Sequence, residues 1–331
     1  MLLKSLRGRS FLVSGAYGLI GSYLVCLLIE ANRQLGLGIC VKALDRNVGL
    51  PKRFPKNCED SVKCHILDVC MDSLPVEKYD YVIHAASNTS PGDYASKPID
   101  TIWTNVYGGK RLMDLAVKAG AKRFLFCSSV EAYGRSNGDV DKFTESYSGY
   151  VDSNTARAGY PAAKRCVEAL CNAYAVEHPE FDFVIARIGR FYGPTLILGD
   201  TKAPSQFIGN AIHGEDIVLK SDGTQLYSWG YVQDCVTGIL TLIVKGSNGE
   251  AYNIADPQSC RTLKDFAKIT ADAGGVAIRF AEQSAIEKAG YSKITKAVLD
   301  VSKLQSLGWS AKTHLEKGIP LTINYLKKGC L

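Results

Sequence analysis

No segment of this 331-residue sequence holds the run of about 18 apolar residues that a membrane-spanning helix requires. We therefore expect no membrane span and no membrane partner. Residues 1–9 include three basic residues but no apolar stretch typical of a signal peptide. The chain is accordingly predicted to be cytoplasmic.

Histidine is scarce, and no metal-binding motif is present. There are five histidines, and the eleven cysteines include neither a CxxC pair nor a Cys/His ligand spacing, so no metal site is expected. We expect reduced thiols, with Cys127, Cys166 and Cys171 filling the core. The net charge is +6 without a basic run. Nucleic-acid binding is therefore not expected, whereas a phosphate-bearing ligand suits the mild positive charge.

A glycine-rich turn follows the first apolar run of the chain. It lies between the apolar residues 11–13 and a helical segment at 22–30. A strand, a tight glycine turn and a helix N-terminus form a seat for a dinucleotide pyrophosphate, because the turn allows close approach and the helix supplies amides and a positive dipole. The residues predicted to contact the cofactor here are Gly15, Gly18, Leu19, Ile20 and Gly21.

Apolar runs alternate with amphipathic segments through the first half of the chain, which predicts a Rossmann-type α/β fold with a doubly wound parallel sheet. After Pro194 the pattern is looser and predicts a smaller C-terminal substrate-binding domain. We expect residues 1–190 to form the dinucleotide-binding domain, with 228–255 returning to it, and 191–331 to be mainly substrate-binding. The expected strands are 11–14, 39–44, 63–67, 81–84, 123–127, 183–188 and 251–254, and the expected helices 22–30, 106–119, 161–175, 206–213 and 231–244.

Further cofactor contacts are predicted at the ends of the next strands. Asp45 ends the second strand, where a carboxylate accepts hydrogen bonds from the adenosine ribose and disfavours a 2′-phosphate, so NAD is expected rather than NADP. The adjacent Arg46 leaves NADP open, because an arginine there can bind that phosphate. Other expected cofactor contacts, after the third and fourth strands, are Asp68, Val69, Ala85, Ala86 and Ser87.

Tyr160 and Lys164 lie four residues apart, which places them on one helix face. The lysine ammonium and a positive nicotinamide ring would together stabilise a tyrosinate, which requires about 4 kcal/mol to bring the phenol pKa from near 10 to neutrality. The tyrosinate would take a proton from a substrate hydroxyl as hydride leaves the same carbon. Ser129, at the end of the fifth strand, would share the hydrogen bond to that oxygen.

These motifs, in this order, resemble the extended short-chain dehydrogenase/reductase family, in particular its NAD-dependent nucleotide-sugar epimerases, dehydratases and decarboxylases. The resemblance covers nearly the whole chain, and includes the stretches Thr104-Asn-Val-Tyr-Gly108, Arg187 with Tyr192-Gly-Pro194, and Tyr231-Val-Gln-Asp234. It implies NAD as cofactor, with Asn105, Tyr160 and Lys164 among its ligands. It also implies a nucleotide-sugar substrate oxidised at C4, and a homodimer built on the helices at 106–119 and 161–175.

Glu131 indicates a branch of this family, the dTDP-glucose 4,6-dehydratases and UDP-glucuronate decarboxylases, which carry glutamate at this place. A carboxylate beside a 4-keto sugar can take the C5 proton and help expel a C6 leaving group, although Glu131 could instead simply pair with a cation. Residues 156–165 and 168–174 resemble the decarboxylases. We favour 4,6-dehydration, with decarboxylation and 4-epimerisation as alternatives and a non-catalytic NAD-binding sensor or subunit as an alternative of another class.

The chain departs from the family at positions that contact substrate. Arg190 replaces an asparagine, Thr195 and Tyr227 replace arginines, the second of them a diphosphate ligand, and Val130 replaces the aspartate of many dehydratases and the serine of decarboxylases. Because a guanidinium binds anions in ways a phenol cannot, we expect altered sugar or nucleotide specificity. The residues predicted to bind substrate are Asn88, Thr89, Ser129, Arg190, Gln206 and Tyr227.

Overall fold

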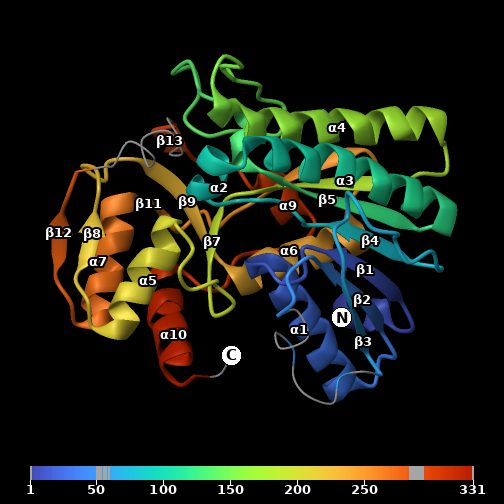
Figure 1. Ribbon diagram of the computed structural model, residues 1–331, viewed down its shortest axis with the longest axis horizontal. Coiled ribbons are helices and arrows are strands. Elements are labelled where there is room, and N and C mark those ends of the chain that lie inside the picture. The colour runs from blue at the N-terminus through green and yellow to red at the C-terminus, as the bar shows by residue number, and fades with distance from the viewer. Residues whose placement is uncertain (1, 50–53, 55–57, 59, 283–293, 330–331) are drawn as a thin grey trace.

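The computed structural model describes residues 2–49, 54, 58, 60–282 and 294–329 (Figure 1). Its largest element is a seven-stranded parallel sheet in the order β10-β6-β5-β4-β1-β2-β3. This confirms the predicted Rossmann-type α/β fold. The strands are β1 (Ser10–Ser14), β2 (Cys40–Asp45), β3 (Val62–Ile66), β4 (Tyr81–His84), β5 (Arg123–Ser129), β6 (Phe183–Ile188) and β10 (Glu250–Ile254).

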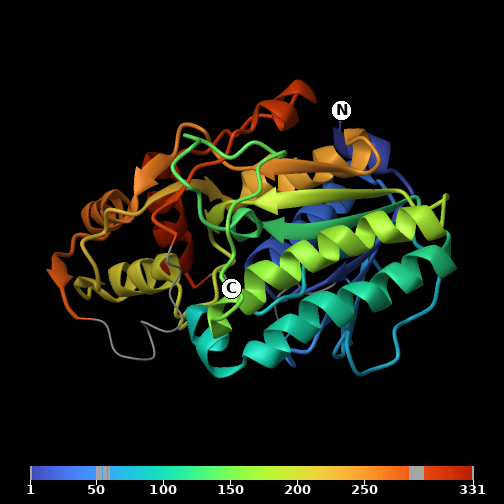
Figure 2. The same ribbon diagram turned by 90° about the horizontal axis from the view of Figure 1, so that it is seen from above.

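Helices cover both faces of this sheet. Figure 2 shows α3 (Pro98–Ala119) and α4 (Gly159–Glu177) side by side across one face, and α1 (Leu19–Leu35) and α6 (Val232–Lys245) pack on the other. Successive strand residues point to opposite faces of the sheet. Leu12 therefore belongs to the core beneath α3 and α4, whereas Phe11 belongs to the core beneath α1 and α6. Burial on both faces explains why these strands are continuously apolar.

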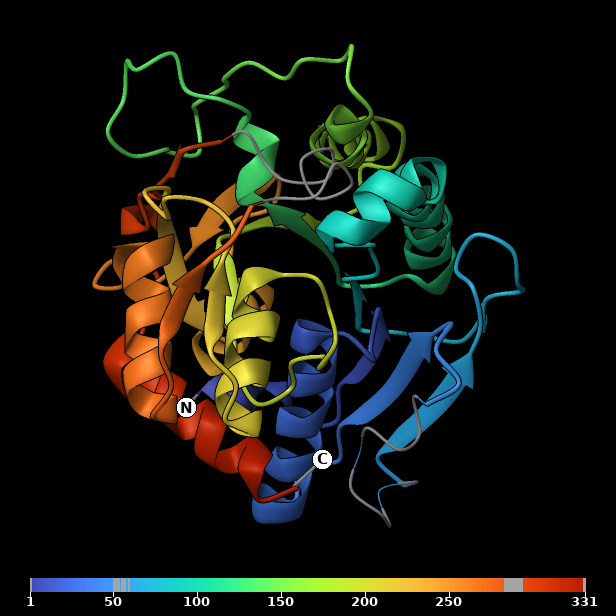
Figure 3. The same cartoon turned by 60° about the vertical axis from the view of Figure 1, so that its left-hand side comes forward.

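The remaining elements gather at one end of the sheet, on the left of Figure 1 and nearer the viewer in Figure 3. They enclose a separate apolar core that includes Trp229 and Phe266. Strand β9 pairs with β7, β11 and β13, while β8 pairs with β12. The elements are β7 (Arg190–Tyr192), α5 (Ala203–His213), β8 (Ile217–Leu219), β9 (Leu226–Tyr231), β11 (Cys260–Thr262), α7 (Leu263–Gly274), β12 (Ile278–Phe280), β13 (Lys296–Ala297) and α10 (Leu315–Lys327).

Short helices complete the fold. A helical turn over Leu2–Leu6 precedes β1, and α9 (Ser302–Ser306) packs near β10. Three short segments lie close to the carboxyl ends of the sheet strands: α2 (Pro91–Ser96), and the 3-10 turns η3 (Val130–Tyr133) and η4 (Ala156–Ala158). These segments border the cavity described below.

Some sequence expectations were wrong in detail, among them one helix start and one core cysteine. Helix α3 begins at Pro98 rather than at residue 106. The sequence did not predict this start, because the first turns expose Ile99 and Trp103 and bury Thr101 and Thr104, the reverse of an amphipathic pattern. Cys166 is exposed on α4, whereas Cys127 and Cys171 are buried as expected.

Two general properties of the described residues bear on function. None of their helices is both long and apolar enough to cross a lipid bilayer. Over the same residues, no cluster of three histidine, cysteine, aspartate or glutamate side chains is arranged to hold a metal ion. The cysteines in this part of the chain form no disulfide.

Candidate active site

A cavity of about 1150 Å³ lies at the carboxyl ends of the sheet strands, between the sheet and the second group of elements. It is lined by every residue predicted to bind cofactor or substrate or to act in catalysis, apart from Asn105. Asn105 is fully buried behind the wall, where its amide nitrogen donates to Ser87 Oγ at 2.9 Å and to the Thr101 carbonyl at 2.7 Å. It therefore supports a wall residue rather than facing the cavity.

The glycine turn closes one end of the cavity with backbone alone. Gly15 has φ +71°, and a Cβ there would lie 2.6 Å from the carbonyl carbon of Ala85. Gly21 is equally constrained, since its Cβ would collide with the Gly15 carbonyl oxygen. Helix α1 begins directly after Gly18 and has no side-chain cap, so its first amides stay available for an anion. This cradle fits a dinucleotide pyrophosphate.

Asp45 and Arg46 lie beside this turn at the end of β2. The Asp45 carboxylate accepts hydrogen bonds from the amides of Tyr17 and Asn47, both at 3.0 Å, which fixes its orientation at the cavity wall. Arg46 instead donates to both carboxylate oxygens of Asp100, at 3.2 and 3.0 Å. Because its donors are engaged there, the arrangement suits the ribose hydroxyls of NAD better than the phosphate of NADP.

Arg46 also engages residues predicted for other roles. Its guanidinium donates to the side-chain oxygen of Asn88 at 2.7 Å and lies 3.7 Å from Asp68. Asn88 in turn donates to Asp100 at 2.7 Å. Asn88 thus lines the cavity while its side chain is held by Arg46 and Asp100. Its predicted contact with substrate would use only hydrogen-bonding capacity that these two partners do not occupy.

Tyr160, in the first turn of α4, points its hydroxyl toward Ser129 and Tyr94. Burial raises the pKa of Tyr160 to about 12, while hydrogen bonds from Ser129 and Tyr94 and the charge of Arg157 act in the opposite direction. The phenol is therefore protonated at neutral pH in the chain by itself. The tyrosinate expected from the sequence requires the additional positive charge of an oxidised nicotinamide.

Lys164 lies one turn further along α4. Its ammonium donates to the Cys127 carbonyl at 2.7 Å and lies 5.6 Å from the centre of the Tyr160 ring. Burial lowers the pKa of Lys164 to about 8. The lysine is thus tied to the end of β5 beside the tyrosine, as the four-residue spacing predicted.

Glu131, in η3, pairs with cations, which the sequence left as its alternative role. Its carboxylate accepts a short hydrogen bond from Arg157, and its other oxygen lies 3.9 Å from Arg190. The Arg157 guanidinium also lies 4.3 Å above the Tyr94 ring, and two of its nitrogens, Nε and Nη1, are buried without a hydrogen-bond partner. Two arginines therefore surround the carboxylate two residues from Ser129.

The four positions that depart from the family have different surroundings. The Arg190 guanidinium stacks 3.9 Å above the Tyr227 ring. Val130 is buried in the second apolar core, so no acid occupies its place. Thr195 donates to the Leu19 carbonyl at 2.7 Å and so connects the loop after β7 to α1.

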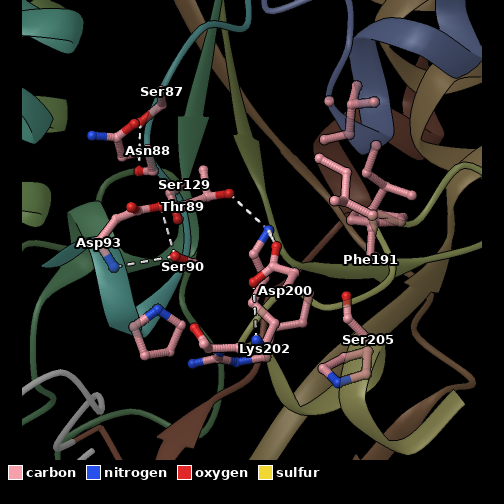
Figure 4. Close-up of a pocket in the computed structure, with 18 of the residues that line it drawn as sticks. Ser87, Asn88, Thr89, Ser90, Asp93, Ser129, Phe191, Asp200, Lys202 and Ser205 are labelled. Atoms are coloured by element: carbon pink, nitrogen blue, oxygen red, sulfur yellow. Dashed lines mark hydrogen bonds and ion pairs between the residues drawn. The ribbon is translucent and has the colours of Figure 1, made fainter. Parts of the chain in front are cut away.

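Among the cavity residues that were not predicted from the sequence are Tyr94, Arg157 and Lys202. Lys202 reaches across the opening to Thr89 at 2.7 Å, and Figure 4 shows this contact bridging the cavity. Arg157 lies within the segment 156–165 that resembles the decarboxylases, and this resemblance could have identified it as a site residue. Nothing in the sequence distinguished the other two, because their roles depend on loops that meet only in the fold.

Comparison with known proteins fits this geometry. The chain is 31% identical over 325 residues to UDP-glucuronic acid decarboxylase 1 of Xenopus tropicalis, covering 97% of this chain and 72% of that protein. Its fold matches a UDP-glucose 4-epimerase of Thermotoga maritima with a TM-score of 0.82 at 24% identity, over 97% of this chain and 100% of the other. A dTDP-glucose 4,6-dehydratase of Streptomyces venezuelae, solved with NAD bound, matches with a TM-score of 0.80 at 23% identity, over 96% and 97% of the two chains.

The model of the NAD dependent epimerase/dehydratase family matches residues 11–255. This span runs from the first strand of the sheet to the end of β10 and includes the glycine turn, Ser129, Tyr160 and Lys164. The match confirms the family and cofactor predicted from the sequence. The chain belongs to the NAD dependent epimerase/dehydratase family.

Proposed function

We propose that this enzyme is an NAD-dependent decarboxylase of a nucleotide-linked hexuronic acid, with UDP-glucuronate as the first substrate to test. The observation that carries the proposal is the pair of arginines, Arg157 and Arg190, around Glu131 beside Ser129. Two guanidinium groups against one carboxylate leave net positive charge where the sugar would react, and this charge suits a sugar that carries a carboxylate.

Dehydration, which the sequence favoured, suits this site less well. Elimination of water from C6 requires a proton donor for the departing hydroxyl. Val130, an apolar side chain buried in the second core, occupies the place where many dehydratases have an aspartate. Decarboxylation requires no acid for its leaving group, because carbon dioxide departs without a proton.

The first step would be oxidation at C4. Ser129 and Tyr160 would hold the C4 hydroxyl, and Tyr160 would take its proton. NAD bound in the glycine cradle would supply the hydride acceptor at C4 and later the donor. The positive charge of Lys164 beside the tyrosine would favour the phenolate during this step.

The second step would be loss of carbon dioxide. A ketone at C4 places the C6 carboxylate in the β-keto position, so the C5–C6 bond breaks and its electron pair forms an enolate across C5, C4 and the C4 oxygen. Hydrogen bonds from Ser129 and Tyr160 to that oxygen would stabilise the enolate. A proton from solvent then adds at C5. After hydride returns to C4, Tyr160 gives back the proton it took.

The relatives support the same reaction. The Xenopus tropicalis protein, named as a UDP-glucuronic acid decarboxylase, aligns over nearly all of this chain. In this chain Glu131 would then act mainly by orienting Arg157 and Arg190, rather than as the base that a dehydratase requires.

Mass spectrometry of the purified protein incubated with NAD and separate UDP-, dTDP-, GDP- and CDP-sugars, including UDP-glucuronate, tests this proposal. We expect UDP-glucuronate to lose carbon dioxide, and Tyr160→Phe to slow that conversion by about 10²- to 10⁴-fold while NAD binding persists. Loss of water would identify a dehydratase, and an unchanged mass with a new retention time an epimerase. No conversion of any sugar by a protein that binds NAD would favour the non-catalytic alternative. Each of these three results would contradict the proposal.

A further inference from the structure

Two departures from the family pattern contact each other in the folded chain. Arg190, on β7, replaces an asparagine, and Tyr227, on β9, replaces an arginine. The two strands pair in parallel, with Arg190 opposite Trp229, so residues 37 positions apart in sequence become neighbours. The guanidinium carbon of Arg190 lies 3.9 Å above the centre of the Tyr227 ring. The site has thus lost an arginine from one strand and gained one on the strand beside it.

The Tyr227 ring is a fixed support. Its hydroxyl donates to the Ile294 carbonyl at 3.2 Å, and its ring packs edge-on against Trp229 with centroids 5.6 Å apart. Tyr227 is buried, with 6% of its surface exposed. A ring held at both its hydroxyl and its edge fixes the plane of a guanidinium stacked on it.

Stacking leaves the hydrogen-bonding edge of Arg190 available. A guanidinium contacts a ring through its face, whereas its N–H groups lie in its plane and point outward. The Nε of Arg190 is buried without a hydrogen-bond partner. The nearby carboxylate of Glu131 is 3.9 Å from Arg190 but accepts its short hydrogen bond from Arg157. Arg190 therefore retains donors and positive charge for an anion in the cavity.

The position of Arg190 distinguishes between the anions of a nucleotide sugar. In a hexopyranose ring C5 is bonded to C4 and carries C6, whereas C1, which carries the diphosphate, lies across the ring from C4. Ser129 and Tyr160 mark the place of C4, and Arg190 approaches the Glu131 carboxylate two residues from Ser129. A cation near C4 would be close to the substituents on C3 and C5 and far from the diphosphate on C1, and among those nearby substituents only the C6 carboxylate of a uronic acid is charged.

We propose that Arg190, supported by Tyr227, binds the C6 carboxylate of the sugar and determines the preference of this enzyme for a uronic acid over the neutral sugar. Arg190 on β7 would bind an anion near the sugar, while the Tyr227 ring on the neighbouring strand β9 holds its guanidinium in place. This inference rests on the proposed decarboxylation for its substrate, and it assigns to Arg190 and Tyr227 a role that the family pattern does not supply.

The test compares two ligands that differ only at C6, UDP-glucuronate and UDP-glucose. Dissociation constants are measured by calorimetry on NAD-loaded protein carrying Tyr160→Phe, so that substrate is consumed slowly during the titration. Adding Arg190→Ala should weaken UDP-glucuronate by about 30-fold, the loss of charge-assisted hydrogen bonds, and UDP-glucose by about twofold or less. Lys202→Ala, which removes a different positive charge from the same cavity, should affect the two ligands equally.

A second set of variants tests the support. Tyr227→Phe keeps the ring and should retain the preference, whereas Tyr227→Leu removes the stacking surface and should reduce it by about fivefold. The double variant Arg190→Asn, Tyr227→Arg rebuilds the pattern expected in the family, in which the arginine at 227 is a diphosphate ligand. It should therefore strengthen both ligands about equally and leave the preference as low as in Arg190→Asn. Thermal unfolding identifies any variant that fails to fold. If Arg190→Ala fails to fold, the double variant Arg190→Asn, Tyr227→Arg replaces it in the comparison of the two ligands.

The outcomes separate this inference from the proposed function. An Arg190-dependent preference for UDP-glucuronate in protein that releases no carbon dioxide would support the inference and contradict the proposed reaction. Release of carbon dioxide, with Arg190→Ala weakening both ligands equally or neither, would overturn the inference and leave the proposed reaction standing.

Discussion

Arg157 and Glu131 form a short ion pair at the wall of the cavity, although 26 residues separate them in sequence. Arg157 enters from η4 and Glu131 from η3, so the pair joins the end of β5 to the start of the helix that carries Tyr160. Both side chains are largely buried. The pair therefore sets the geometry of the site as well as its charge.

Removing one partner of this pair should cost more stability than removing both. Arg157→Met leaves the Glu131 carboxylate buried with only the longer contact to Arg190, and we expect the free energy of unfolding to fall by about 3 kcal/mol. The double variant Arg157→Met, Glu131→Gln should recover at least about 1 kcal/mol of this loss, because no unpaired charge remains. Urea denaturation of the four proteins measures the coupling. Simple additivity of the two single effects would show that the pair contributes no coupling to stability.

Gly15→Ala should abolish tight cofactor binding. The new Cβ would lie 2.6 Å from the backbone of Ala85, and the residue would have to keep φ +71°. We expect the dissociation constant for NAD, measured by calorimetry, to rise at least about 100-fold, since pyrophosphate binding depends on this turn. Gly209→Ala in α5, where a Cβ meets nothing within 4 Å, is the matched control and should leave it unchanged. Equal dissociation constants for NAD in the two variants would contradict the role of the glycine turn as the pyrophosphate site.

The buried Lys164 predicts a pH dependence of stability. Its folded pKa is about 8, below the unfolded value of about 10.4. Below pH 8 both states hold the proton, and between the two values the unfolded state holds more, so stability rises with pH by up to about 1.4 kcal/mol per unit. The difference in free energy of unfolding between the natural protein and Lys164→Met should therefore grow in favour of the natural protein by about 1.5 kcal/mol from pH 8 to 9.5. A constant difference would mean that the folded lysine keeps an ordinary pKa and a falling difference that its pKa is raised, and either result would contradict this prediction.

The outer face of α3 predicts a homodimer. Ile99, Trp103 and Tyr107 recur every four residues and are 71%, 55% and 42% exposed, an apolar row that favours a covering surface. We expect sedimentation to report a dimer and Trp103→Glu to shift it toward monomer. Phe280→Glu on β12, another exposed aromatic in the second group of elements, should leave the dimer intact. A monomeric natural protein would contradict this prediction.

The sequence predicted the strands well where burial makes them uniformly apolar. The expected bounds of the strands at 81–84 and 183–188 match β4 and β6. It predicted the start of α3 poorly, because Ile99 and Trp103 face outward there while Thr101 is buried. In that turn the apolar side chains form an exposed row rather than part of the core, and periodicity alone cannot tell the two apart.

The site was predictable where its chemistry depends on local spacing. The glycine turn and the Tyr160–Lys164 spacing each lie within a single turn or helix, so sequence distance translates directly into geometry. The partners of Glu131 could not be predicted, because Arg157 reaches it across a long loop and Arg190 reaches it from β7. Likewise the contact of Arg190 with Tyr227 exists only because β7 pairs with β9, a pairing without a local signal.

The most direct test of the account follows the carboxyl carbon of the substrate. UDP-glucuronate labelled at C6 is incubated with the purified protein and NAD, and label is counted in released gas and in the recovered nucleotide sugar. We predict that the label leaves as carbon dioxide, that the remaining sugar is a pentose, and that Tyr160→Phe slows the release by about 10²- to 10⁴-fold. Label retained in a converted nucleotide sugar would contradict decarboxylation.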